Sequence, residues 1–408
     1  MIPELEEVPA GQEIETLQRA VERCADTLAG TAFVDHERAG WLSWELTADG
    51  RPTTMRGGNP ALYDGDSGNA YACAALGVAL DRSDLIDLSV QAARHALNRS
   101  SGLGPALLSG RPGVELAARR IELLTGAWVA DIDVSGWGQA DRNGADLTDG
   151  LAGTLYAGSV LGARLSAQRE LVEGLTAAGV PGPVGRCWPD ASAADRRPLC
   201  GLAHGASEVA LALAEAAAQQ TILATEAGPL IGAALAWERA WFDPIRGSWP
   251  DLRGEAISYP AWWCHGAAGI GLVRLRMLAL QRAGLDFGLP EPSLLAEAGA
   301  AIRAGSAELA RAVAGGGHPA GLTLCHGAGG ALELLTLAAE VFGVDEHLQL
   351  GQQFAAQLLV GLDRDPLRWT TGLPVLGGGG LFLGLGGAAA VLARLAFPGR
   401  RIPPVALP

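Results

Sequence analysis

The chain has 408 residues, of which 49% are hydrophobic and 18% charged, so it can bury a large core and is neither disordered nor fibrous. Its formal net charge is −14, and all of its basic residues apart from histidine are arginines. Because such a surface repels a phosphate backbone, we expect no nucleic-acid partner.

Two segments bear on the location of the protein. Residues 1–15 are acidic, whereas a secretory signal begins with basic residues and an apolar stretch, so we predict a cytoplasmic protein. The uncharged stretch 371–393 is long enough to cross a bilayer. It contains Pro374 and the glycine run 377–380, however, so we predict a loop that leads into a buried helix and no membrane span.

A glycine pair with the pattern GxxG recurs along the chain and divides it into repeats. The first glycines of the seven motifs are Gly65, Gly110, Gly150, Gly205, Gly266, Gly327 and Gly384. The motifs are 40 to 61 residues apart, which is room for two helices and their connections. In the fourth motif Glu208 replaces the second glycine, and we expect this change to loosen the fourth repeat.

The segments on either side of the motifs have different helical patterns. After each glycine pair the sequence is rich in Ala and Leu on all sides, as in residues 210–218, whereas the intervening segments are amphipathic, as in residues 292–314. This alternation predicts an all-α fold in which an inner ring of buried helices is wrapped by an outer ring. We therefore predict a single domain over residues 1–408, an α/α toroid of seven helical hairpins. An open solenoid is the alternative, but the varying repeat lengths and the recurring glycines favour closure.

Polar residues gather just before the first glycine of several motifs. Asp64, Asp149, His204, His265 and His326 come immediately before it, Cys264 and Cys325 come two residues before it, and Asp146 comes four residues before Gly150. Equivalent positions in neighbouring repeats of a toroid face the same end of its central cavity. We therefore expect these side chains to converge there.

Cys264, Cys325 and His326 form a candidate zinc site, because thiolate and imidazole ligands suit zinc. Three protein ligands leave one coordination position open, which is typical of a catalytic site. The alternative is that each cysteine is a small buried apolar residue. Two cysteines in the same register, one of them followed by a histidine, favour the metal site.

Three further residues are candidates for acid–base chemistry. His204 shares the register of His326 without a neighbouring cysteine, so it is a candidate acid or base, with a core histidine or a fourth zinc ligand as alternatives. Asp146 could orient an imidazole of the neighbouring repeat, cap a helix, or do both. His265 is the weaker catalytic candidate. His318 could lie on a loop over the cavity, although a solvated loop position is the simpler interpretation.

The other cysteines and a group of tryptophans have simpler interpretations. Cys187 and Cys200 lie outside the glycine register and are interpreted as structural, and Cys24 and Cys73 fall in helical stretches where packing explains them. Five tryptophans precede or adjoin Cys264: Trp237, Trp241, Trp249, Trp262 and Trp263. They could line a site for apolar side chains of a peptide or pack the long segment that carries them.

Three motifs, GLAHG (201–205), WCHG (263–266) and LCHG (324–327), give the chain a family resemblance. In this order and on these repeats they resemble the lanthionine cyclases, the LanC-like family, and the resemblance extends from about Trp41 to Phe397. It implies a seven-repeat α/α toroid with zinc at one end of the cavity. By this resemblance Cys264, Cys325 and His326 are the zinc ligands, and His204 is the acid–base residue, acting with Asp146.

The resemblance also implies a reaction. A cysteine thiol of a precursor peptide adds to a dehydroalanine or dehydrobutyrine, and the product is a lanthionine or methyllanthionine thioether ring. Zinc lowers the pKa of the thiol, so that a thiolate forms at neutral pH. The enolate that results needs a proton, for which His204 is our first choice and His265 the second. A separate dehydratase is the expected partner, because no dehydratase region is found in the sequence.

Two departures refine the resemblance, and two other functions stay open. Some members of the family have an arginine four residues before the first zinc cysteine, where this chain has Pro260, and a tyrosine where this chain has His265. Both features resemble the cyclase domains of class II-type lanthipeptide synthetases. One alternative function is the addition of glutathione to dehydroamino acids. The other is a non-catalytic toroid that binds peptides, against which the complete set of zinc ligands argues.

Overall fold

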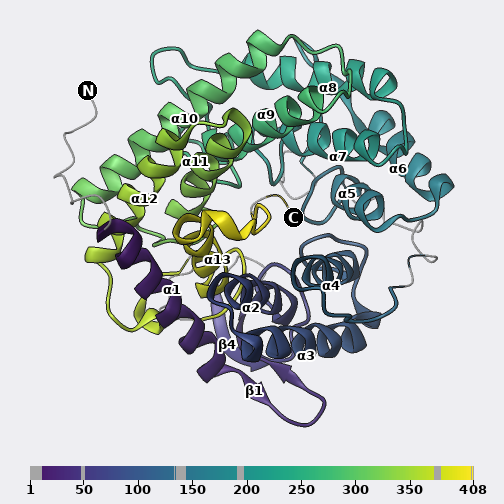
Figure 1. The fold of residues 1–408 in the computed structure, drawn as a ribbon. Coiled ribbons are helices and arrows are strands. Elements are labelled where there is room, and N and C mark those ends of the chain that lie inside the picture. The colour runs from purple at the N-terminus through teal and green to yellow at the C-terminus, as the bar shows by residue number, and fades with distance from the viewer. Residues whose placement is uncertain are drawn as a thin grey trace. The chain divides into compact units, whose positions relative to one another are not determined.

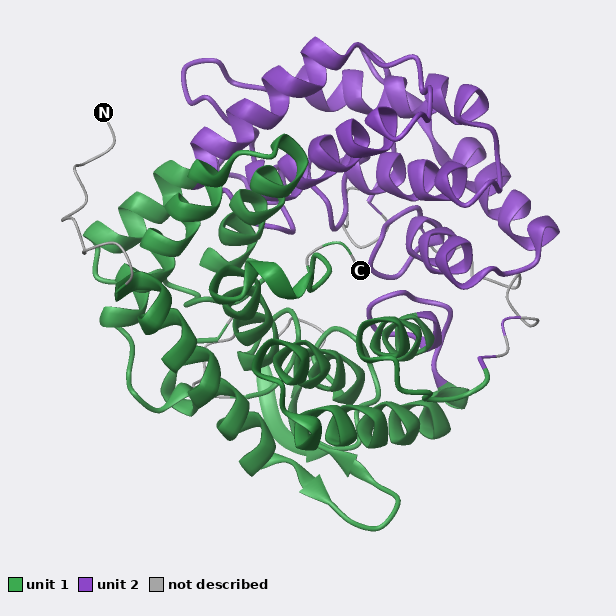
Figure 2. Ribbon diagram, in the orientation of Figure 1, with its two compact units in different colours: residues 1–102, 113–131, 306–408 green, residues 103–112, 132–305 purple. Residues whose placement is uncertain are grey.

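The structure is a computed structural model that describes residues 12–46, 51–132, 134, 144–190, 197–371, 378–405 and 407. It is mostly helical, with 58% helix. Its contacts divide it into two compact units (Figure 2). Unit 1 comprises residues 1–102, 113–131 and 306–408, and unit 2 comprises residues 103–112 and 132–305. The single-domain organisation of residues 1–408 stays a prediction.

Unit 1 contains both ends of the chain. Its helices are α1 (Gln12–Thr31), α2 (Asp66–Leu80), α3 (Ser83–Arg99), most of α4 (Arg111–Thr125), the end of α10 (Glu291–Ala314), α11 (Ala328–Phe342), α12 (Asp345–Val360) and α13 (Leu385–Ala396), with short 3₁₀ helices η1 (Ser100–Gly102), η2 (Pro366–Arg368) and η3 (Pro398–Arg400). The last α-helix, α13, packs against the first two, α1 and α2 (Figure 1). An open solenoid keeps its first and last repeats apart, so this contact favours the closed alternative.

Unit 2 continues the same pattern of helix pairs. It contains α5 (Leu151–Leu161), α6 (Leu165–Ala178), α7 (Ala206–Ala218), α8 (Ala224–Arg239), α9 (Ala267–Arg282) and most of α10. Helix α7 packs against α5 and α9, while α6 and α8 pair with α5 and α7 (Figure 1). Inner helices thus contact inner helices, and each of these outer helices packs on its own inner partner.

The seven glycine motifs each lead into a helix, as the sequence predicts. These helices are α2, α4, α5, α7, α9, α11 and α13. Apart from α4, which exposes Arg119 and Leu123, they are buried on nearly all sides, and every residue of α13 is buried. The outer helix α1 instead buries one face, with Leu17, Val21 and Leu28 inside and Glu15 and Arg19 exposed. The predicted alternation of buried and amphipathic helices is confirmed.

The second glycine of the motif is the point where neighbouring repeats touch. A Cβ atom on Gly153 would lie 2.7 Å from the Cβ of Leu107, and a Cβ on Gly269 would lie 2.7 Å from the Cβ of Leu202. Each of these leucines comes three residues before the first glycine of the preceding repeat. Gly68 of the first repeat makes the same contact with Leu381 of the seventh, at 2.8 Å. The last repeat therefore meets the first in the way that consecutive repeats meet.

Backbone hydrogen bonds join the segments that precede the inner helices, which we call the glycine loops. The residue two before the first glycine donates its N–H to the carbonyl of the same position in the next repeat. The pairs are Leu108 to Thr148, Ala203 to Cys264, Cys325 to Phe382 and Phe382 to Tyr63, with N···O distances of 2.9 to 3.1 Å. The last pair joins repeat seven to repeat one, so the first and last glycine loops pair through the same positions as consecutive loops do.

Glu208 does not loosen the fourth repeat, contrary to the expectation from sequence. Its side chain is 2% exposed, and its Oε2 accepts a hydrogen bond of 2.5 Å from the backbone N–H of Leu147 in the third repeat. Leu147 stands three residues before Gly150, the position that meets the second glycine elsewhere. A hydrogen bond thus replaces the glycine contact at this step, and the sequence pattern did not reveal the partner.

The described residues include three short antiparallel strand pairs that the all-α prediction did not include. They pair β1 (Phe33–Val34) with β2 (Ala39–Gly40), β3 (Leu42–Leu46) with β4 (Pro52–Gly57), and β5 (Val180–Pro181) with β6 (Arg186–Cys187). In the first, the Asp35 carboxylate accepts the backbone N–H groups of Glu37 and Arg38 and so stabilises the turn. The hairpins join helices and leave the helical fold class unchanged.

Substitution Gly68→Ala tests the contact between the first and last repeats. The added methyl would meet the carbonyl oxygen of Leu62 at 2.3 Å and the Cβ of Leu381 at 2.8 Å. We expect the free energy of unfolding to fall by about 1–3 kcal/mol, measured by urea denaturation. In the control Gly30→Ala, on α1, the methyl meets nothing within 4 Å and should stabilise by about 0.4–1 kcal/mol. Equal effects of the two substitutions would contradict the contact.

Candidate functional site

In unit 2, three glycine loops bring the candidate acid–base residues together. Asp146 precedes α5, His204 precedes α7, and Cys264 and His265 precede α9. The rings of His204 and His265 stack with their centroids 5.9 Å apart, and Nδ1 of His204 lies 3.8 Å from Oδ1 of Asp146. Their positions relative to the first glycine of each motif predicted that these residues converge, and within unit 2 they do lie together.

The GLAHG segment is held against the following loop by its backbone. The N–H groups of Leu202 and Ala203 both donate to the carbonyl of Cys264, each at 3.1 Å. Gly201 has a φ of +124°, and a Cβ there would lie 2.5 Å from the same carbonyl oxygen. Only glycine satisfies both the backbone angle and the close approach. This glycine therefore fixes His204 relative to Cys264.

A buried carboxylate clamps the same segment from the other side. Glu238 of α8 is fully buried, and its Oε1 accepts the N–H of Gly201 at 2.9 Å while its Oε2 accepts the hydroxyl of Ser207 at 2.5 Å. Its charge is balanced by Arg274 of α9, which is also fully buried and lies 2.8 Å away. Arg274 also donates to Glu297 at 2.8 Å. His204 thus stands between two residues, Gly201 and Ser207, that are bonded to one carboxylate.

Asp146 serves its own loop as well as facing the imidazole. Its Oδ1 accepts the hydroxyl of Thr148 at 2.5 Å and the backbone N–H of Asp149 at 2.7 Å. At 3.8 Å from Nδ1 of His204, the same oxygen acts on the ring through its charge and forms no hydrogen bond with it. Nδ1 of His204 is buried and has no hydrogen-bond partner among the described residues. The carboxylate is therefore fixed in place beside an imidazole that keeps this nitrogen unbonded.

His265 has a different environment from His204. Its side chain is buried, and Nδ1 lies 3.3 Å from the carbonyl oxygen of Cys200. The pKa of His265 is lowered to about 3, mainly by burial and also by the charge of Arg253, while Asp251 opposes the shift. The ring is accordingly neutral near neutral pH, with a proton on Nδ1 that can donate to the carbonyl of Cys200.

In unit 1, Cys325 and His326 occupy the glycine loop before α11. Cys325 is buried, its N–H donates to the carbonyl of Phe382 at 3.0 Å, and its sulfur accepts a hydrogen bond of 3.2 Å from the hydroxyl of Tyr63. The ring of Tyr63 stacks on Phe382, with centroids 5.1 Å apart. The sulfur of Cys325 is thus fixed by contacts from the loops of the first and seventh repeats.

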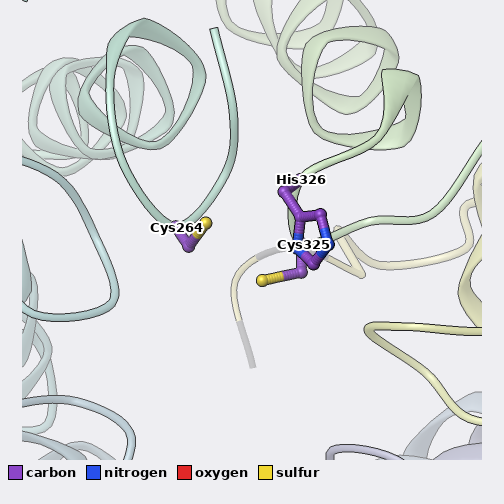
Figure 3. A group of neighbouring side chains, drawn as sticks. All are labelled: Cys264, Cys325 and His326. Carbon is purple, nitrogen blue, oxygen red and sulfur yellow. The ribbon is translucent and has the colours of Figure 1, made fainter. Parts of the chain in front are cut away.

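Figure 3 shows the three predicted metal ligands, with Cys325 and His326 next to each other in the glycine loop before α11. The sulfur of Cys325 and a ring nitrogen of His326, both in unit 1, lie within 4.8 Å of each other. Two sulfur donors and one imidazole form a donor set that suits zinc. Cys264 belongs to unit 2, and Cys325 and His326 belong to unit 1.

Several other residues singled out in the sequence lie elsewhere. The side chain of His318 is not solvated, because it is 7% exposed and its Nε2 lies 3.1 Å from a carboxylate oxygen of Glu308. Cys24, Cys73, Cys187 and Cys200 are buried free cysteines, in keeping with structural roles. Trp237, Trp249 and Trp263 are buried, and only Trp241 of the five tryptophans is exposed, which favours packing over a peptide-binding surface.

Two residues that support the site were not predicted from the sequence. Glu238 carries no motif of its own, and its partners lie 31 and 37 residues away in the chain, so no local pattern points to it. Tyr63, in contrast, stands two residues before Gly65, the register of Cys264 and Cys325. Comparison of this position across all seven repeats would have found it.

Comparisons with known proteins place the chain in a family. The model of the family "Lanthionine synthetase C-like protein" matches residues 58–406, so the chain belongs to this family. Among solved structures the chain is similar in fold to "Nisin cyclase", with a TM-score of 0.60 and 14% identity, over 94% of this chain and 95% of that chain. A search of curated proteins finds no significant match.

These findings bear directly on the sequence-based expectations. The family resemblance is confirmed, and the helical content together with the fold match is consistent with the predicted α/α toroid. The finer similarity to class II-type cyclase domains stays a prediction. No helix within the described residues is long and apolar enough to cross a membrane; α13, at the end of the uncharged stretch, has 12 residues.

Burial makes a prediction about Glu208, the residue that joins the third and fourth repeats. Its burial raises the pKa of its carboxyl group well above the ordinary value, and the charge of Asp146 adds to the shift. The folded protein therefore keeps this proton where the unfolded chain has lost it. The stabilisation is complete below the unfolded pKa and is lost as the pH rises through the folded pKa, by up to about 1.4 kcal/mol per pH unit.

We expect Glu208→Gln to reduce this loss of stability as the pH rises above the ordinary pKa of a glutamate carboxyl group. The amide oxygen can still accept from Leu147, so the variant should fold. Urea denaturation at several pH values measures the difference, with Glu173→Gln, an exposed glutamate of α6, as the control. Parallel stability curves for wild type and Glu208→Gln would show that the carboxyl titrates normally.

Proposed function

We propose that this chain is a zinc-dependent lanthionine cyclase that adds cysteine thiols of a dehydrated precursor peptide to its dehydroalanine or dehydrobutyrine residues. The observation that carries the proposal is the donor set itself: Cys264 and Cys325 each stand two residues before the first glycine of their motifs, and His326 follows Cys325. Membership of the lanthionine synthetase C-like family supports it.

The donor set fits a zinc ion with one open position. Cys264, Cys325 and His326 would hold the metal and leave the fourth position to a substrate thiol. Bound there, zinc would lower the pKa of that thiol, so that it reacts as a thiolate near neutral pH. Cys264 and Cys325 are both 5% exposed, which limits the access of water to their sulfurs.

The reaction is a net addition of S–H across a carbon–carbon double bond. The sulfur forms a bond to the β-carbon, the π bond breaks, and its electron pair moves onto the carbonyl oxygen as an enolate. The thiol proton is lost to a base, and a proton must then reach the α-carbon. A side chain of the protein has to deliver this proton to the face of the α-carbon that is turned toward that side chain.

We assign proton delivery to His204 rather than His265. The side chain of His204 is 26% exposed, whereas His265 is buried and has a pKa lowered to about 3, so His265 carries no transferable second proton near neutral pH. A histidine in a partly exposed position can exchange its proton with solvent between turnovers. This difference in burial supports the assignment.

Asp146 is placed to position the ring of His204. Its Oδ1 lies 3.8 Å from Nδ1 of His204. Asp146 stays in this position because Thr148 and the Asp149 N–H bind the same oxygen. We therefore assign to Asp146 the role of keeping the ring of His204 oriented.

The proposal implies partners and leaves one competing function. The substrate must first be dehydrated at Ser or Thr, so a dehydratase is a required partner activity. Glutathione addition to dehydroamino acids would use the same metal and the same proton donor. The two functions differ in the source of the thiol, which can be measured.

The test is a cyclisation assay on a dehydrated peptide that carries a free cysteine, with reduced glutathione present. A cyclase consumes the free thiol without a change of peptide mass, as read by alkylation and mass spectrometry. A glutathione transferase would instead give a product heavier by one glutathione. If the metal-loaded protein neither consumes the free thiol nor gives the heavier product, both functions are contradicted.

We expect His204→Gln to lower the cyclisation rate by about 10²–10⁴-fold, because it removes the proton donor. Zinc content should stay at the wild-type level, because His204 is not one of the assigned ligands. The control is His318→Gln, a histidine bonded to Glu308 in unit 1. An unchanged rate in His204→Gln would remove His204 from the mechanism.

A further inference from the structure

We propose that Tyr63 is a positioning residue of the metal site, whose hydroxyl donates a hydrogen bond to the sulfur of Cys325 and stabilises it as the thiolate ligand. This inference rests on the proposed function, because it concerns the same metal site. It adds a residue that is neither a predicted ligand nor a predicted acid or base.

The contact itself is short and comes from an equivalent position in another repeat. The distance from Oη of Tyr63 to Sγ of Cys325 is 3.2 Å. Tyr63 stands two residues before Gly65, as Cys325 stands two residues before Gly327. In this register the glycine loops present their side chains to the same end, so a residue of the first repeat can reach a cysteine of the sixth.

Phe382 of the seventh repeat supports both partners of this hydrogen bond. The N–H of Phe382 donates to the carbonyl of Tyr63 at 2.9 Å, and its ring stacks on the tyrosine ring at an interplanar angle of 12°. The carbonyl of Phe382 accepts the N–H of Cys325 at 3.0 Å. All three residues belong to unit 1. The hydroxyl and the sulfur are therefore held at this distance by backbone bonds on both sides.

The hydroxyl has a chemical consequence for a bound metal. Cys325 is 5% exposed, so little water is available to solvate a thiolate there. A donor aimed at the sulfur supplies part of that stabilisation, since hydrogen bonds to charged groups are stronger than those between neutral groups. Because the sulfur shares its charge with the hydroxyl, it donates less electron density to the metal. A metal at this site then keeps more positive charge to activate a thiol at its open position.

Tyr63→Phe tests the inference, because it removes the hydroxyl and keeps the ring that stacks on Phe382. The zinc affinity is measured by competition with a chromophoric chelator, and the absorption spectrum is recorded after replacement of zinc by cobalt(II). We expect about 10-fold weaker zinc binding or more, and a sulfur-to-cobalt charge-transfer band at lower energy. The control is Tyr71→Phe, the same change in a buried tyrosine of α2, which should alter neither measurement.

The outcomes separate this inference from the proposed function. If wild type binds zinc and Tyr63→Phe has the same affinity and the same cobalt spectrum, the role of Tyr63 is overturned and the metal site stands. If wild type binds neither zinc nor cobalt, the metal site fails and the inference fails with it. A shift in the cobalt band with Tyr63→Phe alone supports the inference, because a purely structural role of the tyrosine ring is preserved in this variant.

Discussion

The close contact between consecutive glycine loops is the constraint on which the rest of the structure depends. Because the second glycine of the motif has no Cβ, a leucine of the preceding repeat can approach it closely. A backbone hydrogen bond joins equivalent positions of the two loops. The contact between Gly68 and Leu381 is the same one, made between the first and the last repeat. Where Glu208 stands in place of glycine, its carboxylate bonds to the neighbouring backbone and keeps the step intact.

This constraint explains why residues far apart in the sequence share a function. Each loop reaches its glycine in the same register, so the residues one and two positions before it face the same end of the helices. In unit 2 this register brings His204 beside His265, and the neighbouring loop adds Asp146. In unit 1 it brings Tyr63 to Cys325. The helices supply the rigidity, and the loops carry the chemistry on a shared backbone network.

The periodic part of the fold could be predicted from sequence because it repeats. Seven glycine motifs predicted the beginnings of seven buried helices, and the register predicted that Asp146 and His204 lie together. The family resemblance ranked His204 before His265 as proton donor, but the sequence could not supply the physical reason, which is the difference in burial of the two rings. The sequence could not reveal the Glu238–Arg274 pair either. Glu238 lies on the outer helix α8 and Arg274 on the inner helix α9, so the pair leaves no local pattern in the sequence.

The local departures from the pattern were also beyond sequence reasoning. Glu208 reads as a defect in a glycine motif until its partner, 61 residues earlier in the chain, is known. His318 lies in a glycine-rich segment that is typical of a solvated loop, and only the folded chain places Glu308 against it. In both cases a polar side chain is satisfied by one specific tertiary contact.

The most direct test of the central claim is the metal content and coordination of the purified protein. Elemental mass spectrometry should find about one zinc per chain, and X-ray absorption should find two sulfur neighbours at about 2.3 Å and nitrogen or oxygen neighbours at about 2.0–2.1 Å. Cys264→Ala and Cys325→Ala should each lose the metal, whereas Cys73→Ala, a buried cysteine of α2, should keep it. Wild-type protein without zinc after growth in zinc-replete medium, or zinc without sulfur neighbours, would contradict the account.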